Sequence, residues 1–156
     1  MHTGMLHLHN FMRWIILITA VIAVITYLTG LLKEKEFSKG ADRIGLIFTI
    51  VMDIQLLTGL YLYFKSAAFQ SLTSDFGATM KSTYLRFFGI EHLIGMLIAL
   101  ILVHAGRSRV KKYAESGKKY RIGLIFYALA LIIMLAMIPW PFRHEIAKPW
   151  FPGMPL

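Results

Sequence analysis

The chain has no cysteine, and few of its residues are acidic. The missing thiols exclude disulfides, thiolate metal sites and thiol chemistry. Among 156 residues, 17 Lys and Arg stand against 8 Asp and Glu, which gives a formal net charge of +9. Such an excess can indicate nucleic-acid binding, but the basic residues are scattered in short segments between apolar runs. This distribution is typical of membrane-protein loops, so we expect no nucleic-acid partner.

Apolar side chains are abundant, at 57% of the residues, and the mean hydropathy is +0.62. They gather in four runs, at about 8–32, 44–64, 84–106 and 122–138. About 20 apolar residues are enough for a helix to cross the roughly 30 Å hydrocarbon layer of a bilayer. No internal repeat, low-complexity tract or linker divides the chain. We therefore predict a single all-α domain over residues 1–156, an integral membrane protein built as an antiparallel four-helix bundle.

The connecting segments differ in charge, and this difference predicts the orientation. Eleven of the 17 basic residues follow the first or the third run: Lys33, Lys35, Lys39, Arg43, Arg107, Arg109, Lys111, Lys112, Lys118, Lys119 and Arg121. Basic loops face the cytoplasm, so we expect both termini on the outer side of a bacterial inner membrane. The N-terminus lacks a basic n-region and a cleavage site, so we expect its helix to be retained. Expected partners are lipid and other membrane subunits or a homo-oligomer.

Ionisable residues interrupt the third run, which contains Glu91 and His92 in its apolar part. Such groups are costly in a membrane and usually face a partner inside the bundle. In the expected orientation, His92 lies roughly 12 Å from the outer end of its helix, and His9 lies at the outer end of the first helix. Two histidines at similar depth on facing helices are what bis-imidazole ligation of haem iron requires. We therefore predict a haem b with His9 and His92 as its axial metal ligands.

The residues around His92 fit a haem site. Gly89 and Gly95 flank it at i−3 and i+3, and small residues let a flat macrocycle approach the backbone. Glu91 or a backbone carbonyl would orient a ligand imidazole through its second ring nitrogen.

Two arginines lie near the same end of the expected bundle. Arg13 follows His9 by one turn, and Arg86 lies near the outer end of the third helix. Guanidinium groups bind carboxylates in bidentate fashion, so we expect these side chains to pair with haem propionates.

The same polar residues allow two other hypotheses. In the first, Arg13, Asp53, Glu91 and His92 form a buried polar lock in a haem-free structural subunit or assembly factor. In the second, Asp53 and Glu91 conduct protons or ions. Asp53 lies near the middle of the second run and should not face lipid, and we expect Arg13 or His92 as its partner.

Other roles are considered for His104 and for the pair of His7 and His9. His104 lies near the cytoplasmic boundary, where no second histidine is available at its depth, so we expect an interfacial role and a single haem. His7 and His9 could bind copper or zinc together with Glu91, but only if residues 1–8 are not helical.

Four segments together identify a family resemblance. They read HLHNFMRW at 7–14, DIQLLTGLYLYF at 53–64, LRFFGIEHLIGMLIALILVHAGRSR at 85–109 and IPWPFR at 138–143. The combination resembles a family of small four-helix bacterial membrane proteins labelled cytochrome b or cytochrome-b-like, and it covers nearly the whole chain. The resemblance implies a b-type haem, ligated by His9 and His92, in an electron carrier or redox subunit. The chain departs from the respiratory cytochromes b, whose helices carry two histidines on one face and bind two haems.

Overall fold

The computed structural model describes residues 2–151 and 153–154, and within this part of the chain it contains helices and no strand. Four helical segments are long and apolar enough to cross a membrane. They are α1 (His2–Leu32), α2 (Lys39–Phe64), the continuous segment formed by α5 (Thr83–Arg86), η1 (Phe87–Glu91) and α6 (His92–Lys112), and α7 (Ser116–Met137). The all-helical class and the four long apolar helices agree with the sequence-based prediction. Residues 1, 152 and 155–156 of the expected domain lie outside the described part.

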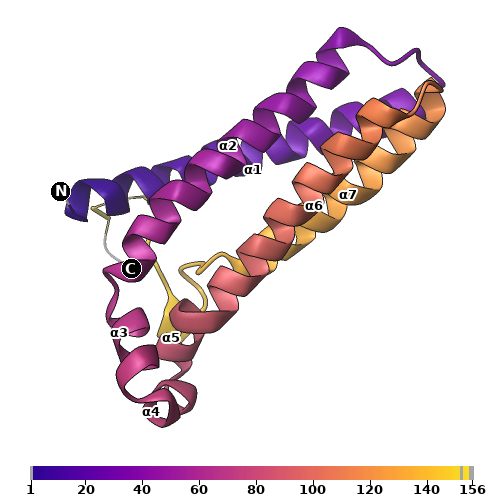
Figure 1. The fold of residues 1–156 in the computed structure, drawn as a ribbon. Coiled ribbons are helices and arrows are strands. Elements are labelled where there is room, and N and C mark those ends of the chain that lie inside the picture. The colour runs from indigo at the N-terminus through magenta and orange to yellow at the C-terminus, as the bar shows by residue number, and fades with distance from the viewer. Residues whose placement is uncertain (1, 152, 155–156) are drawn as a thin grey trace.

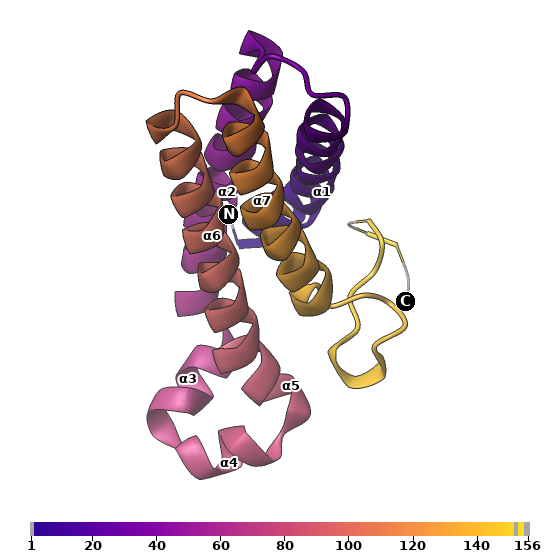
Figure 2. The same ribbon diagram turned by 90° about the vertical axis from the view of Figure 1, so that its right-hand side faces the viewer.

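The long helices pack side by side, with α1 against α2 and α7, and α6 against α7 and α2. The connection from α1 to α2 and the connection from α6 to α7 lie at the same end of the molecule (Figure 1). At the other end, α3 (Ala67–Ser74) and α4 (Phe76–Lys81) join α2 to α5, and Figure 2 shows these short helices below the long ones. The 65–82 connection is therefore largely helical.

A tight turn joins α1 to α2. Glu34 adopts the left-handed conformation, with φ at 47°, and Lys35 donates its backbone N–H to Gly30 O at 3.0 Å. This pairing satisfies one of the carbonyls that the end of a helix leaves without a partner. Ser38 then caps α2, because its Oγ accepts the backbone N–H of Ala41 at 3.0 Å. The short connection brings α2 back alongside α1.

Aromatic rings and glycines fill the contact between the helices near this end. Tyr27 and Tyr127 are fully buried, and their ring centroids lie 5.1 Å apart. Gly123 lies directly against the ring of Tyr27, and Gly30 against that of Tyr120, so a Cβ at either glycine would overlap the ring. Small residues thus let the helix backbones approach closely around large rings.

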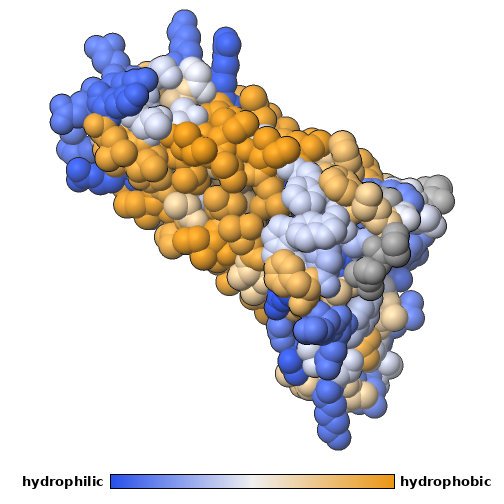
Figure 3. Space-filling view, turned by 180° about the vertical axis from the view of Figure 1, so that it is seen from behind, coloured by the Kyte–Doolittle hydropathy of each residue, from blue (hydrophilic) through white to orange (hydrophobic). Residues whose placement is uncertain are grey.

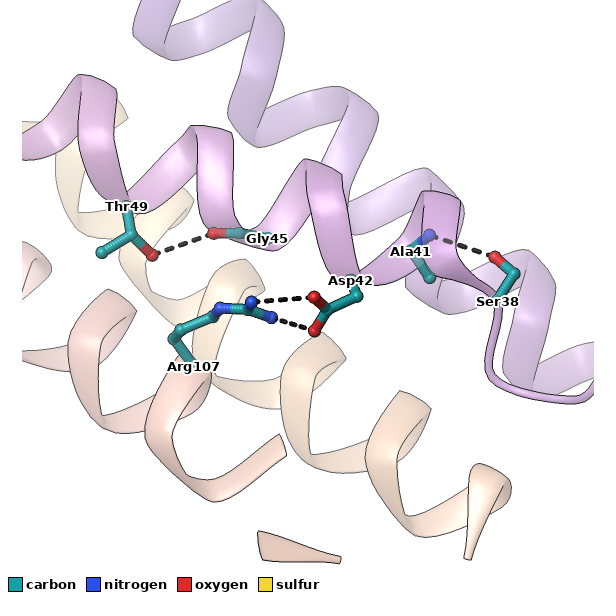
Figure 4. A network of polar contacts seen from close by, with 6 residues as sticks. All are labelled: Ser38, Ala41, Asp42, Gly45, Thr49 and Arg107. Atoms are coloured by element: carbon teal, nitrogen blue, oxygen red, sulfur yellow. Dashed lines mark hydrogen bonds and ion pairs between the residues drawn. The ribbon is translucent and has the colours of Figure 1, made fainter. Parts of the chain in front are cut away.

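An ion pair also ties α2 to α6 at this end (Figure 4). Arg107, only 7% exposed, donates through Nη1 and Nη2 to the two carboxylate oxygens of Asp42, and Nη2 lies 3.0 Å from Oδ2. Farther along α2, Thr49 donates its hydroxyl to Gly45 O at 2.9 Å, which keeps this buried hydroxyl satisfied inside its own helix. The pair of Asp42 and Arg107 fixes which faces of α2 and α6 meet.

The outer surface of the long helices is apolar. Figure 3 shows a hydrophobic band across the middle of the molecule, with hydrophilic residues gathered towards its two ends. Large apolar side chains exposed on the long helices include Ile18, Leu57, Ile101 and Ile132, which are 57%, 67%, 63% and 62% exposed. An apolar surface of this extent around four long helices is suited to contact with lipid.

Candidate functional site

A cavity of about 410 Å³ lies among the long helices at the end opposite the two basic connections. His9 and Arg13 line it from α1, Gln55 from α2, His92 from α6 and Met134 from α7. Its volume lies within the range of about 300 to 1,000 Å³ that is typical of small-molecule and cofactor sites. The two histidines that the sequence singled out therefore line one cavity.

His92 is held by a backbone carbonyl. Its Nδ1 lies 2.8 Å from the carbonyl oxygen of Met137, the last residue of α7. Because a carbonyl can only accept, Nδ1 must carry the hydrogen, and Nε2 keeps its lone pair. His92 also comes directly after η1, a single π-helical turn. A π turn adds a residue to the helix and shifts the register of the residues after it, and such turns are frequent at functional sites.

His9 also donates from Nδ1 to an oxygen, which in this case belongs to α2. Its Nδ1 lies 3.2 Å from Oγ1 of Thr58, and this hydroxyl already donates to the carbonyl of Gln55 at 3.0 Å. The oxygen of Thr58 therefore accepts from Nδ1–H of His9, which leaves Nε2 with the lone pair. The side-chain amide of Gln55 donates to the backbone carbonyl of His9 at 3.0 Å and makes a longer hydrogen bond, of 3.4 Å, to that Nε2, which a metal bound at Nε2 would displace.

Both histidines thus donate from Nδ1 to an oxygen and keep a basic Nε2. This is the arrangement that metal-ligating histidines usually show, because the second hydrogen bond fixes the tautomer and the ring orientation. Gly59 provides the space for His9, since a Cβ at this position would lie 3.0 Å from Cε1 of the ring. Neither Thr58 nor Gly59 was predicted from the sequence, because nothing in the α2 segment shows which of its faces meets His9.

Arg13 brings a buried positive charge to the cavity. It is 6% exposed, and its Nη2 donates to the carbonyls of Pro149 and Trp150 at 3.0 and 2.7 Å. Its Nε and Nη1 are buried and have no partner within the described residues. Leaving charged donors unpaired and buried is costly, so an acidic group entering the cavity would be stabilised here.

The C-terminal segment adds a second cation to the cavity and packs against α1. Lys148 lines the cavity and donates from Nζ to the hydroxyl of Tyr84 at 3.2 Å. Trp14 donates from Nε1 to the carbonyl of Trp150 at 2.9 Å, and its ring stacks on that of Phe151 with centroids 5.5 Å apart. Lys148 was not predicted as a site residue, since only the path of the tail brings it to the cavity.

Two of the expected site residues pair with each other instead of lining the cavity. Arg86 donates from Nε to Oε1 of Glu91 at 2.7 Å, and from Nη1 to the carbonyl of Met80 at 3.2 Å. Their side chains are 36% and 41% exposed. Of the two groups expected to orient a ligand imidazole, the backbone carbonyl fills that role at His92 and Glu91 does not.

The two glycines beside His92 serve helix packing. Gly95 lies against the side chain of Met137, which a Cβ at Gly95 would overlap. Gly89 faces the backbone of α3, where a Cβ would lie 3.4 Å from the carbonyl oxygen of Ala68. Neither glycine lines the cavity, and the glycine beside a cavity histidine is Gly59.

Asp53 finds a partner that we did not expect. It accepts from Nε2 of His104 at 2.8 Å, and neither Arg13 nor His92 contacts it by a hydrogen bond within the described residues. The four members of the hypothetical polar lock therefore have four separate partners and form no common cluster. The helices are instead locked by the ion pair of Asp42 and Arg107.

The other metal arrangement considered from the sequence does not form. α1 is helical from His2 onwards, and Glu91 is engaged by Arg86. Within residues 2–151 and 153–154, no group of three or more His, Cys, Asp or Glu side chains could hold a metal ion.

Comparisons with protein-family models, with curated proteins and with solved structures found no match. What can be inferred about function therefore rests on the residues of the cavity.

Proposed function

We propose that the chain is a small membrane protein that binds one haem b in this cavity and acts as an electron carrier or redox subunit. The observation that carries this proposal is the shared state of His9 and His92. They reach one cavity from two helices, each donates from Nδ1 to an oxygen, and each has on Nε2 a lone pair that is suited to a metal. Neutral imidazole nitrogens are common axial ligands of haem iron.

The rest of the cavity suits an amphipathic macrocycle. Apolar side chains such as Met96, Leu100 and Met134 line its interior, while Arg13 and Lys148 bring positive charge to it. The unpaired Nε and Nη1 of Arg13 are suited to a propionate carboxylate. When bound, a haem would supply reversible one-electron exchange.

Two oxygen atoms of the protein would orient the two ligand histidines. The hydroxyl of Thr58 and the carbonyl of Met137 accept the Nδ1 hydrogens, which makes the opposite nitrogens more basic and holds both rings in place. Ligation by both histidines would favour electron transfer over oxygen chemistry. His104 takes no part, because it is bonded to Asp53 and lies outside the cavity.

For the membrane arrangement, we propose four antiparallel crossings of a bacterial inner membrane with both termini outside. The two basic connections lie at one end of the molecule, and such loops stay in the cytoplasm. The other end carries a cluster of Trp14, Trp140 and Trp150, a residue type enriched at membrane interfaces. The cavity would then open near the outer face.

The natural absence of cysteine makes this orientation easy to test. Ser74→Cys at the end of α3 should react with a membrane-impermeant maleimide in intact spheroplasts. Ala114→Cys, between α6 and α7, should react only after lysis, and both positions are exposed. The reverse pattern would show that the basic loops face outwards.

The visible spectrum of the purified protein tests the haem proposal. We expect a Soret band and, after dithionite reduction, sharp α and β bands, all of which are lost in His9→Ala and His92→Ala. His104→Ala is the matched control, because this histidine lies on the same helix as His92 but outside the cavity. A flat spectrum from folded protein expressed with ample haem would refute the proposal and favour a haem-free structural subunit or assembly factor.

A further inference from the structure

Asp53 and His104 meet on the outer surface of α2 and α6, away from the cavity. Nε2 of His104 lies 2.8 Å from Oδ1 of Asp53, and their side chains are 48% and 46% exposed. Asp53 lies near the middle of α2, inside the apolar run at 44–64, and His104 lies two residues before the end of the apolar run at 84–106. The pair therefore lies within the apolar band of the surface, on the side of the two basic connections.

Apolar side chains surround this pair. Ile50 and Leu57, one turn before and one turn after Asp53, are 47% and 67% exposed. Ile101, one turn before His104, is 63% exposed. In a bilayer these positions face hydrocarbon, where a charged or strongly polar group is costly and normally faces another protein group. A half-exposed Asp–His pair at this depth indicates that protein covers the face.

The hydrogen-bonding atoms of Asp53 and His104 that have no partner indicate which protein covers this face. Within residues 2–151 and 153–154, Oδ2 of Asp53 and Nδ1 of His104 make no hydrogen bond. The first is an acceptor, and the second is a donor when the imidazole is protonated beside the carboxylate. With the doubly protonated ring, the pair therefore presents one free acceptor next to one free donor, and this arrangement is complementary to the same pair turned by half a revolution.

We propose that a second copy of this chain docks on the face formed by Ile50, Asp53, Leu57, Ile101 and His104. Copies inserted in the same direction can be related by a twofold axis along the membrane normal, which brings equal depths together. Nδ1–H of each His104 then donates to Oδ2 of Asp53 in the other copy. Two carboxylates and two imidazolium rings close into a neutral ring of four groups, and the apolar side chains pack around it. Lipid offers no such partners in its hydrocarbon region.

Single-molecule photobleaching in vesicles, combined with disulfide crosslinking, tests this assignment. The labelled protein should bleach mainly in two steps at a lipid dilution where chance co-occupancy is rare. Ile101→Cys and Leu57→Cys should each give a disulfide-linked product of twice the chain mass in oxidised membranes. Ile132→Cys is the matched control, since it is 62% exposed but lies on α7. It should crosslink far less.

Variants of Asp53 and His104 distinguish a specific interface from nonspecific association of the chains. Asp53→Asn should weaken dimerisation about tenfold, or about 1.4 kcal/mol, which is within the range found for interhelical polar contacts in membranes. Combining Asp53→His with His104→Asp exchanges the two groups and should restore dimers to within about threefold. The haem spectrum should be unchanged in both, which keeps this test independent of the cavity.

Three outcomes would overturn the proposal. One is single-step bleaching at every lipid dilution. Another is crosslinking through Ile132→Cys as strong as through both Ile101→Cys and Leu57→Cys. The third is a crosslinked product from native membranes whose mass differs from twice that of the chain, since a different protein would then cover this face.

Discussion

Replacing Thr58 by valine removes the oxygen that accepts from His9 and leaves the shape of the side chain almost unchanged. Thr58 is 6% exposed, so no solvent replaces the lost acceptor. Nδ1–H of His9, now 3.2 Å from this oxygen, would face a methyl group instead. The ring would lose the contact that fixes its tautomer, and Nε2 would become a weaker and less well oriented ligand.

The size of this effect can be worked out in two ways that agree. Loss of the group that orients a metal-ligating histidine typically lowers affinity about 10- to 100-fold, which is about 1.4 to 2.8 kcal/mol. A buried donor left without its partner costs about 1 to 3 kcal/mol. For the haem site proposed above, we therefore expect Thr58→Val to release haem at least about tenfold more readily than the wild type.

Haem transfer to an excess of apomyoglobin in detergent measures this release by absorbance. Thr49→Val is the control, because Thr49 is also on α2, is 7% exposed and donates its hydroxyl to a carbonyl of its own helix. It contacts neither histidine of the cavity and should change haem release by less than about twofold. Equal haem loss in the two variants, or wild-type retention by Thr58→Val, would show that this hydroxyl does not orient a ligand.

Two further predictions concern the packing of the helices. Gly59→Leu should abolish six-coordinate haem spectra, because even a Cβ at this position lies 3.0 Å from the ring of His9 and a larger side chain must displace it. Asp42→Asn should lower the stability of the detergent-solubilised protein by about 1 to 3 kcal/mol, read as a fall in melting temperature. The reason is that the guanidinium of Arg107, 7% exposed, would lose its charged partner, although the 43% exposure of Asp42 moderates the effect.

Each of these changes has a matched control in the chain. Gly40→Leu places the same side chain on α2 where a Cβ meets only Oγ of Ser38, at 3.6 Å, so the haem spectrum should persist. Glu115→Gln breaks the ion pair between Glu115 and Lys118, whose side chains are 63% and 60% exposed, and should leave the melting temperature close to that of the wild type. A wild-type haem spectrum from Gly59→Leu would show that the ring of His9 does not lie against Gly59. An unchanged melting temperature of Asp42→Asn would show that the ion pair does not hold α2 to α6.

The sequence predicted the long helices because an apolar run of sufficient length has few alternatives in a membrane. It placed their ends less well. α2 begins at Lys39, before its apolar run, because Ser38 caps it and the acidic Asp42 is favourable in the first turn of a helix. The interruption of the third segment by η1 left no trace in hydropathy, since a π turn changes the register of a helix and not its polarity.

The relation between His9 and His92 was accessible from the sequence because depth along a helix is set by a fixed rise per residue. Rotation about the helix axis was not accessible, because packing decides it. For this reason Asp53 was assigned to the wrong partners, and its contact with His104 emerged only from the structure.

By itself, then, the sequence determined four apolar helices, a basic end and two histidines at comparable depth, since these depend on composition, spacing and charge along one dimension. Only the tertiary structure decided which faces meet. The packing placed Thr58 and Gly59 against His9, and the Met137 carbonyl against His92. The tail brought Lys148 to the cavity and its carbonyls to Arg13. Such contacts join residues far apart in the chain, and they depend on how rings, glycines and ion pairs fit between helices.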